Sequence, residues 1–255
     1  MDSSGIFLLK TAIRFLKSNQ WKKRLPTPEQ NDIISDMDLT PVLISVKIAI
    51  PAMALSGIFG TALGYVFHRY SFRGKTLLEQ LFMLPLVIPP IVIGFYLVMV
   101  LGRRGLPSLL GLPNLVFTIP GGIIAVTIVC LPLMIRSAKA TFEMMPREYV
   151  EISYTLGKSR IHTFLHVTLP ICGPGILAGL MLSLARAMGE FGASLMILGN
   201  IPGYTTSMPI AIWTHFTAGR EADAFNLVII LTLISVAMML VAEAVSRWSL
   251  ERFER

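Results

Sequence analysis

Five long apolar stretches restrict this chain more than any other feature of its sequence. They cover residues 42–67, 81–101, 115–135, 171–198 and 225–245, and each reaches the roughly 20 residues that a helix needs to cross a hydrocarbon core. None shows the alternation of apolar and polar residues that a membrane β-barrel requires. The sequence therefore predicts an all-α fold, a polytopic membrane protein with five transmembrane helices.

The composition supports a bilayer as the main solvent. Only 15% of the residues are charged, against about 25% in ordinary soluble domains. The net charge of +7 could suggest nucleic-acid binding, but half of the 22 basic residues lie in three segments beside apolar stretches. No basic helix or zinc-ligand spacing accompanies them, so we expect no nucleic-acid partner.

The distribution of lysine and arginine predicts which loops face the cytoplasm. Three segments that must share one side of the membrane carry Arg69, Arg73 and Lys75, then Arg136, Lys139, Arg147, Lys158 and Arg160, and finally Arg247, Arg252 and Arg255. The opposite loops carry only Arg103, Arg104 and Arg220. Because basic loops stay inside, the sequence predicts a multi-pass protein of the cytoplasmic membrane, with its C-terminus in the cytoplasm and its N-terminus outside.

Residues 1–36 fit this topology poorly, because they place six basic residues on the predicted outer side. Their apolar part, residues 5–16, is interrupted by Lys10 and Arg14, and it lacks the charge order and cleavage site of a signal peptide. Two interpretations remain open. The segment is either an amphipathic extension on the membrane surface or the result of a mis-assigned start, with Met37 as the biological first residue. The membrane domain is expected at residues 37–255.

Prolines interrupt two of the predicted spans. Pro85, Pro89 and Pro90 lie in the second, and Pro132 lies in the third. Each removes a backbone donor and bends a helix, which membrane proteins tolerate when neighbouring groups satisfy the freed carbonyls. The bends are consistent with the ordinary plasticity of membrane helices and equally with a role in gating.

The cysteines and histidines predict no metal site. Cys130 and Cys172 lie in or beside apolar segments without CxxC spacing, so we expect two small buried side chains. His162 and His166 could share a helix face, but no acidic or cysteine partner is near in sequence.

Two Gly-Lys pairs, at Gly74 and Gly157, resemble the end of a phosphate-binding loop. Such a loop needs a further glycine five residues earlier, where this chain has Arg69 and Ile152. The chain is therefore expected to bind no nucleotide by this route and to be no enzyme by itself.

The predicted loop at residues 136–170 is the most informative segment. Pro146 suits the first turn of a helix, and Gly157 suits its left-handed end. Between them, one apolar face at helical spacing is formed by Tyr149, Ile152, Ser153 and Leu156.

A second short helix follows in the same loop. Ser159 is expected to cap it, and Pro170 is expected to close it. Its apolar positions are Phe164, Val167 and Leu169. Two helices of this kind either offer a docking surface or pack on their own bundle, and the pattern alone leaves both open.

One motif in this loop resembles a known family. Glu151, then Gly157 after five intervening residues, then Val167, Leu169 and Pro170 match the spacing of the coupling-loop signature of binding-protein-dependent ATP-binding-cassette (ABC) permeases. Ile152 and Ser153 replace the common alanines, and Val167 replaces isoleucine, which preserves a compact helix. The resemblance extends from about Met37 to the C-terminus.

The resemblance implies a type I ABC importer permease that works as a homodimer. In that family the loop inserts into a separate ATPase subunit, which binds ATP and magnesium, so this chain would need no cofactor of its own. A separate extracytoplasmic receptor delivers the substrate, and lipid surrounds the helices. The coupling residues would be Glu151, Ile152, Ser153, Gly157, Val167, Leu169 and Pro170.

The fourth span carries an intramembrane charge pair. Arg186 precedes Glu190 by one helical turn, and Gly189 and Gly192 flank the carboxylate. Charges within the bilayer cost at least about 2.5 kcal/mol each on insertion scales, so they usually face a bundle interior or a pathway. The four residues are interpreted as a brace or gate of the pathway, with a self-satisfying structural ion pair as the alternative.

Residues 185–214 narrow the substrate. The pieces GEFGA and GNIPG resemble permeases of the molybdate and sulfate branch, and the following SMPIAIW looks more like molybdate permeases. The resemblance therefore implies molybdate import by alternating access, with a molybdate-binding receptor as partner. Sulfate, thiosulfate or tungstate import is the alternative, followed by an ion-gradient-driven carrier or a membrane scaffold.

Overall fold

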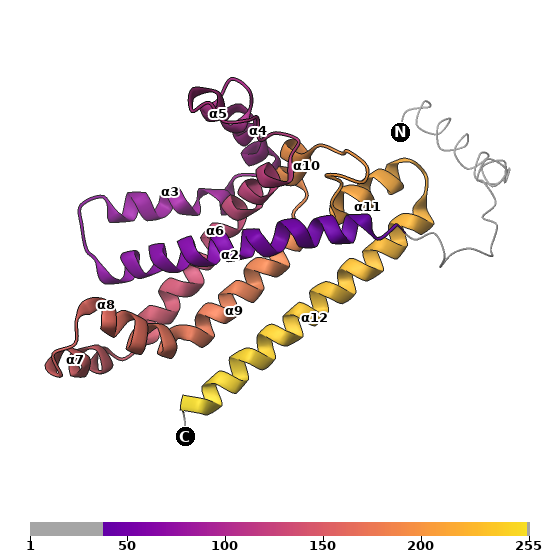
Figure 1. The fold of residues 1–255 in the computed structure, drawn as a ribbon. Coiled ribbons are helices and arrows are strands. Elements are labelled where there is room, and N and C mark those ends of the chain that lie inside the picture. Colours follow the sequence, from indigo (N-terminus) through magenta and orange to yellow (C-terminus); the bar gives the residue numbers. More distant parts are fainter. Residues whose placement is uncertain (1–37, 254–255) are drawn as a thin grey trace, which may run out of the picture. The chain divides into compact units, whose positions relative to one another are not determined.

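A computed structural model of the chain describes residues 38–253, and every regular element within that range is helical (Figure 1). The extension at residues 1–36 lies outside the described residues. The elements are α2 (Thr40–Arg69), α3 (Lys75–Val87), α4 (Pro90–Leu101), α5 (Leu106–Leu109), α6 (Ile119–Met144), α7 (Arg147–Thr155), α8 (Arg160–Thr163), the π-helix η1 (Phe164–Thr168), α9 (Leu169–Met188), α10 (Gly192–Leu198), α11 (Met208–Thr217) and α12 (Glu221–Phe253).

Five helical segments of the described chain are long and apolar enough to cross a membrane. They are Thr40–Arg69, Pro90–Leu109, Ile119–Met144, Arg160–Met188 and Glu221–Val241. Each overlaps one of the five predicted stretches, so the predicted number of spans is confirmed. Their bounds differ from the prediction, because the sequence pattern did not locate two helix breaks or the extra turns at the loop ends.

The second predicted span, 81–101, is not one helix. The chain forms α3, then leaves helical geometry at Ile88 and Pro89, both with ψ near 130°, and resumes as α4 at Pro90. A proline disfavours the helical region for the residue before it, and two adjacent prolines impose that restriction twice. Pro85, by contrast, is accommodated within α3.

The fourth predicted span, 171–198, is also broken. Its helix ends at Met188, with Gly189 as the C-cap, and a short helix restarts at Gly192. Upstream, α8, η1 and α9 run together from Arg160 to Met188. Helix α6, which forms the third span, continues to Met144, so residues 136–144 of the predicted loop are helical.

The core lies between α2, α6 and α9. Buried side chains from these helices include Ile48, Ala52, Val126, Cys130 and Met188. Two glycines allow α2 to approach α6 closely, because a Cβ atom at Gly60 would lie 2.6 Å from Met134 Cγ, and one at Gly64 would lie 2.9 Å from Ala138 Cβ. Small residues one turn apart are the usual means of such packing in membranes.

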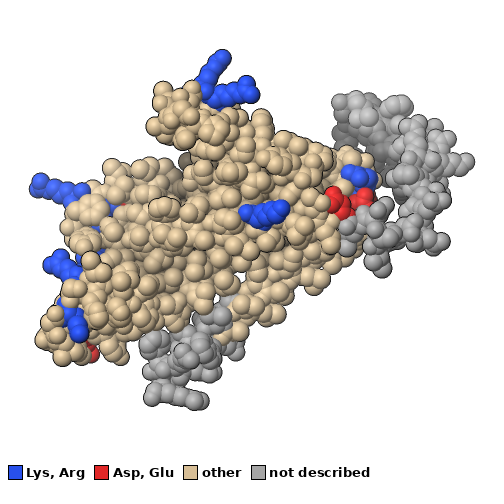
Figure 2. Space-filling view, in the orientation of Figure 1, with Lys and Arg blue, Asp and Glu red and all other residues tan. Residues whose placement is uncertain are grey.

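The loop helices and the basic residues lie together. The turn between α2 and α3 is at the same end of the bundle as α7 and α8 (Figure 1). Lysine and arginine side chains gather at this end, while the long flank of the bundle is almost free of charge (Figure 2). We call this end of the bundle the loop end.

Candidate functional site

The first loop helix forms where the sequence predicts it. Pro146 is the N-cap of α7, and Gly157 follows its end with φ +73°, a backbone conformation that side chains with a Cβ rarely adopt. The Gly157 N–H donates to the Tyr154 carbonyl at 2.9 Å, which closes the helix. Thus the motif glycine is required by the turn itself.

The second loop helix begins as predicted but does not end at Pro170. The Ser159 hydroxyl accepts a hydrogen bond from the His162 N–H at 3.3 Å and caps α8. The chain then passes through η1 into α9, where Pro170 lies in the first turn. The prediction that Pro170 closes the helix is wrong. A wide π turn directly before the proline accommodates its missing donor, so the loop becomes continuous with the long helix.

A buried hydroxyl pair fastens α7 to α8. Ser153 is buried, and its Oγ lies 2.8 Å from Thr163 Oγ1. The predicted apolar face of α7 is therefore divided: Ser153 points inward, while Tyr149, Ile152 and Leu156 remain exposed. Neither Thr163 nor the pairing was predicted, since a hydroxyl in an amphipathic segment carries no signal for its partner.

The exposed apolar side chains of the loop form a surface of their own. They are Tyr149, Ile152, Leu156, Ile161 and Leu165, which we call the loop patch; Leu156 is 71% exposed and Ile161 is 74% exposed. A helix on a protein surface normally turns its apolar face inward. The exposed apolar side chains of these adjoining helical segments are therefore a candidate interaction site.

The remaining motif residues divide between surface and support. Glu151 and Pro170 are exposed, whereas Val167 and Leu169 are partly buried, Leu169 against the cluster around Met134 and Phe142. Phe164 anchors the loop, since its ring centroid lies 4.5 Å from that of Tyr65.

The intramembrane ion pair exists, but not on one helix face. Arg186 Nη1 lies 2.5 Å from Glu190 Oε2, while Glu190 Oε1 accepts a hydrogen bond from the Ala193 N–H at 2.9 Å. Glu190 lies between α9 and α10 rather than within a helix, which corrects the predicted placement. Its side chain is 1% exposed, against 33% for Arg186. The carboxylate therefore joins the end of one helix to the start of the next.

The two helix breaks meet at this point. A Cβ at Gly192 would lie 2.9 Å from the Ile91 backbone nitrogen, and one at Gly94 would lie 2.9 Å from Ala193 Cα. Thus α10 packs directly on the first turns of α4. Gly189 differs, because a Cβ there would meet nothing closer than 3.8 Å. Gly192 is thus in a close helix contact, whereas Gly189 lies where helix α9 ends.

The described residues hold no cluster of three or more histidine, cysteine, aspartate or glutamate side chains placed for a metal ion. Cys130 and Cys172 are free and buried, as their apolar context predicts. The His162 and His166 rings are stacked, with centroids 4.2 Å apart.

Solved structures with the same fold come from ABC importers. A chain of a bacterial alginate ABC transporter, solved with an alginate-bound periplasmic protein, has a TM-score of 0.68 at 18% identity, covering 95% of this chain and 93% of that one. A chain of the inward-facing MetNI methionine ABC transporter has a TM-score of 0.65 at 15% identity, covering 82% and 94%. The fold is therefore that of a type I ABC importer permease.

The chain belongs to the family described as the binding-protein-dependent transport system inner membrane component, which it matches over residues 56–255. It is 35% identical over 229 residues to the molybdenum transport system permease ModB of Escherichia coli K12, covering 88% of this chain and all of that one. It is 40% identical over 207 residues to a protein of Bacillus subtilis named for the same transport system, covering 78% and 90%. A sulfate permease of Synechocystis is 32% identical over 203 residues, covering 78% and 74%. The resemblance seen in the sequence is confirmed.

Proposed function

We propose that this chain is the membrane-spanning subunit of an ATP-driven importer that moves molybdate by alternating access. The observation that carries the coupling to an ATPase is the loop patch, an apolar surface held rigidly at one end of the bundle. Two relatives that match over most of the chain are named for molybdenum transport, which supports molybdate as the substrate.

The loop is built to transmit a movement. Ser153 and Thr163 hold α7 on α8, and α8 runs through η1 into α9 as one helical segment of 29 residues, about 43 Å long. That segment ends at the Arg186–Glu190 pair, beside the contact of α10 with α4. Displacement of the loop by an ATPase would therefore reach both helix breaks, and Glu151 and Gly157 would act as coupling residues.

The same elements suggest the pathway. Arg186 and Glu190, with Gly189 and Gly192 beside them, would line or brace the pore near the two breaks. Helix α3 has no buried residue in the described chain, which fits a position against a second permease subunit or lipid. We infer an assembly of two permease copies and two ATPase subunits, with ATP and magnesium bound by the latter.

Orientation follows from charge. The loop end, with its basic residues, would face the cytoplasm together with the C-terminus, and the opposite loops would face the molybdate-binding receptor. Receptor docking and ATP-driven closure would then favour opposite states of one equilibrium.

The coupling proposal is tested with two matched exposed positions in different loops, one in α7 and one after α5. Ile152→Glu places a charge in the loop patch, whereas Leu112→Glu places one on the loop after α5; the side chains are 56% and 54% exposed. We expect Ile152→Glu to lose the ATPase subunit during purification and Leu112→Glu to retain it. Equal retention by both variants would contradict the proposal.

The substrate is tested by uptake into vesicles that hold the whole complex. Molybdate uptake should persist in a large excess of sulfate and fall when tungstate is added. If sulfate suppresses the uptake as strongly as unlabelled molybdate does, the result would favour a sulfate permease. A sulfate permease is the second candidate because the chain is 32% identical to the Synechocystis protein.

A further inference from the structure

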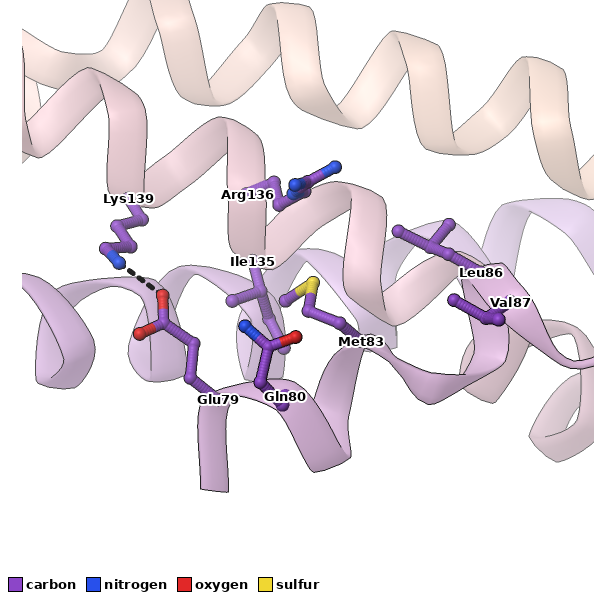
Figure 3. A pocket seen from close by; sticks show the side chains of 8 residues that line it. All are labelled: Glu79, Gln80, Met83, Leu86, Val87, Ile135, Arg136 and Lys139. Atoms are coloured by element: carbon purple, nitrogen blue, oxygen red, sulfur yellow. Dashed lines mark hydrogen bonds and ion pairs between the residues drawn. The ribbon is translucent and has the colours of Figure 1, made fainter. Parts of the chain in front are cut away.

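A pocket of about 220 Å³ lies between α3 and α6 (Figure 3). Its polar half holds Glu79, Arg136 and Lys139. Its apolar half is formed by Met83 and Val87 of α3 and Ile135 of α6. The pocket is separate from the loop patch and from the Arg186–Glu190 pair.

The charges in this pocket are unequally paired. Lys139 forms an ion pair with Glu79 across the two helices and lies 3.9 Å from Glu143 on its own helix. Arg136 forms no hydrogen bond or ion pair with any described residue, although it lines the same pocket. Arg136 is exposed, so its guanidinium group is available to an anion from outside the described residues.

The depth of this guanidinium can be estimated from the length of α6. A hydrocarbon core of about 30 Å takes about 20 helical residues, and α6 begins at Ile119, so Lys139 falls near the far boundary of the core. Arg136 lies one turn inside that boundary, about 4.5 Å deeper. An arginine side chain at this depth reaches the level of lipid phosphates.

The outer wall of the pocket is apolar and open. Val87 is 81% exposed, and none of the described residues of α3 is buried. A surface that combines one unpaired cation at headgroup depth with an adjoining apolar groove is complementary to a phospholipid. Basic pockets between membrane helices on the cytoplasmic side are a known form of headgroup site.

We infer that the pocket between α3 and α6 binds an anionic phospholipid, with the lipid phosphate on Arg136 and an acyl chain along Met83 and Val87. Its assignment to the cytoplasmic leaflet rests on the orientation proposed above. A free oxyanion shares the phosphate chemistry but leaves the apolar half of the pocket uncovered.

The test measures lipid retention rather than transport, so its failure is distinct from failure of the transport proposal. The full-length chain is reconstituted in nanodiscs with equal phosphatidylglycerol and phosphatidylcholine, then released for native mass spectrometry. Arg136→Gln should retain about five-fold less phosphatidylglycerol, because one basic residue near a membrane surface contributes about that factor. Arg136→Lys should retain most of it. The matched control is Arg104→Gln, an exposed arginine of the loop after α4, which should behave as the wild type.

Two further measurements distinguish a phospholipid from the other possible ligands of the pocket. Val87→Trp fills the apolar groove without changing charge and should also reduce phosphatidylglycerol retention. Millimolar sulfate or molybdate should leave retention unchanged. Equal retention by the wild type and Arg136→Gln would overturn the inference. So would displacement of the lipid by sulfate or molybdate, or loss of a dimer in Arg136→Gln, since these results would assign Arg136 to a free oxyanion or to a second copy of the chain.

Discussion

At the scale of single residues, Glu190 does more than pair with Arg186. One carboxylate oxygen binds the guanidinium group and the other accepts the Ala193 N–H, so a single buried side chain neutralises a charge and caps α10. The Glu190 side chain is far less exposed than that of Arg186, and this difference decides which substitution destabilises the protein more.

We predict that Arg186→Gln destabilises the protein more than Glu190→Gln. Loss of the arginine leaves a carboxylate that is 1% exposed without a counter-charge, which costs about 3–5 kcal/mol for a fully buried pair. Loss of the carboxylate leaves an arginine that is 33% exposed and can reach water, and the glutamine oxygen can still cap α10. Thermal unfolding of the purified variants in detergent measures the order. Equal midpoints would show that both charges are solvated.

A second prediction concerns Gly157. Gly157→Val should leave the protein in the membrane at normal abundance but reduce molybdate uptake and substrate-stimulated ATP hydrolysis. The reason is that φ +73° strains a β-branched residue by roughly 1–2 kcal/mol, which would distort the turn after α7. Gly157→Asn, which tolerates this conformation, should retain more activity. Gly74→Val is the control, since Gly74 has φ +85° at the N-cap of α3 and is equally free of neighbours. An equal loss in both valine variants would indicate general strain rather than coupling.

At the scale of elements, the two broken helices define where the bundle can change shape. The breaks occur at Ile88–Pro89 and at Gly189–Phe191, and α4 packs against α10 just beyond both. At the Gly189–Phe191 break, the Glu190 carboxylate accepts the Ala193 N–H, which a continuous helix would have paired with a backbone carbonyl. Discontinuous helices of this kind occur at substrate sites in transporters.

We predict that only one of two glycines in the fourth span is sensitive to substitution by alanine. Gly192→Ala should lower the unfolding midpoint, because its Cβ would lie 2.9 Å from a backbone nitrogen of α4 that cannot move alone. Gly189→Ala should leave the midpoint within experimental error, since its Cβ has 3.8 Å of clearance and its φ of −90° is ordinary. Differential scanning fluorimetry of the two variants decides the matter. A larger loss in Gly189→Ala than in Gly192→Ala would contradict this prediction.

At the scale of the whole molecule, the fold separates a charged end from an apolar flank (Figure 2). The basic turn between α2 and α3 and the basic loop helices lie together, although they are far apart in sequence. This separation is what a protein needs to remain in a bilayer with one orientation.

We predict opposite labelling of two exposed leucine positions changed to cysteine. Leu156→Cys, in the loop patch, should react with a membrane-impermeant maleimide only in inverted vesicles, and Leu112→Cys only in right-side-out cells. The native Cys130 and Cys172 are buried and should not contribute. Labelling of Leu156→Cys from outside the cell would reverse the proposed topology.

Much of this organisation could be predicted from the residues themselves. The caps of the loop helices, at Pro146 and Ser159, were predictable because capping depends on residues within one turn. The end of the second loop helix was not predictable, because a proline that ends a helix and a proline in the first turn of the next helix have the same sequence context at Pro170. The roles of Ser153, Thr163 and Phe164 as internal supports also escaped prediction, because their partners are chosen by packing.

The sequence by itself determined the number of membrane helices and the family. Backbone groups in lipid must be satisfied within a segment, so apolar length alone implies a helix, and a motif with fixed spacing identifies the loop. Only the tertiary structure decided which prolines and glycines break a helix, which side of α7 faces outward, and that Arg136 meets α3 across a pocket. Those features depend on distances between segments far apart in the chain, and such distances are set by the packing of the whole bundle.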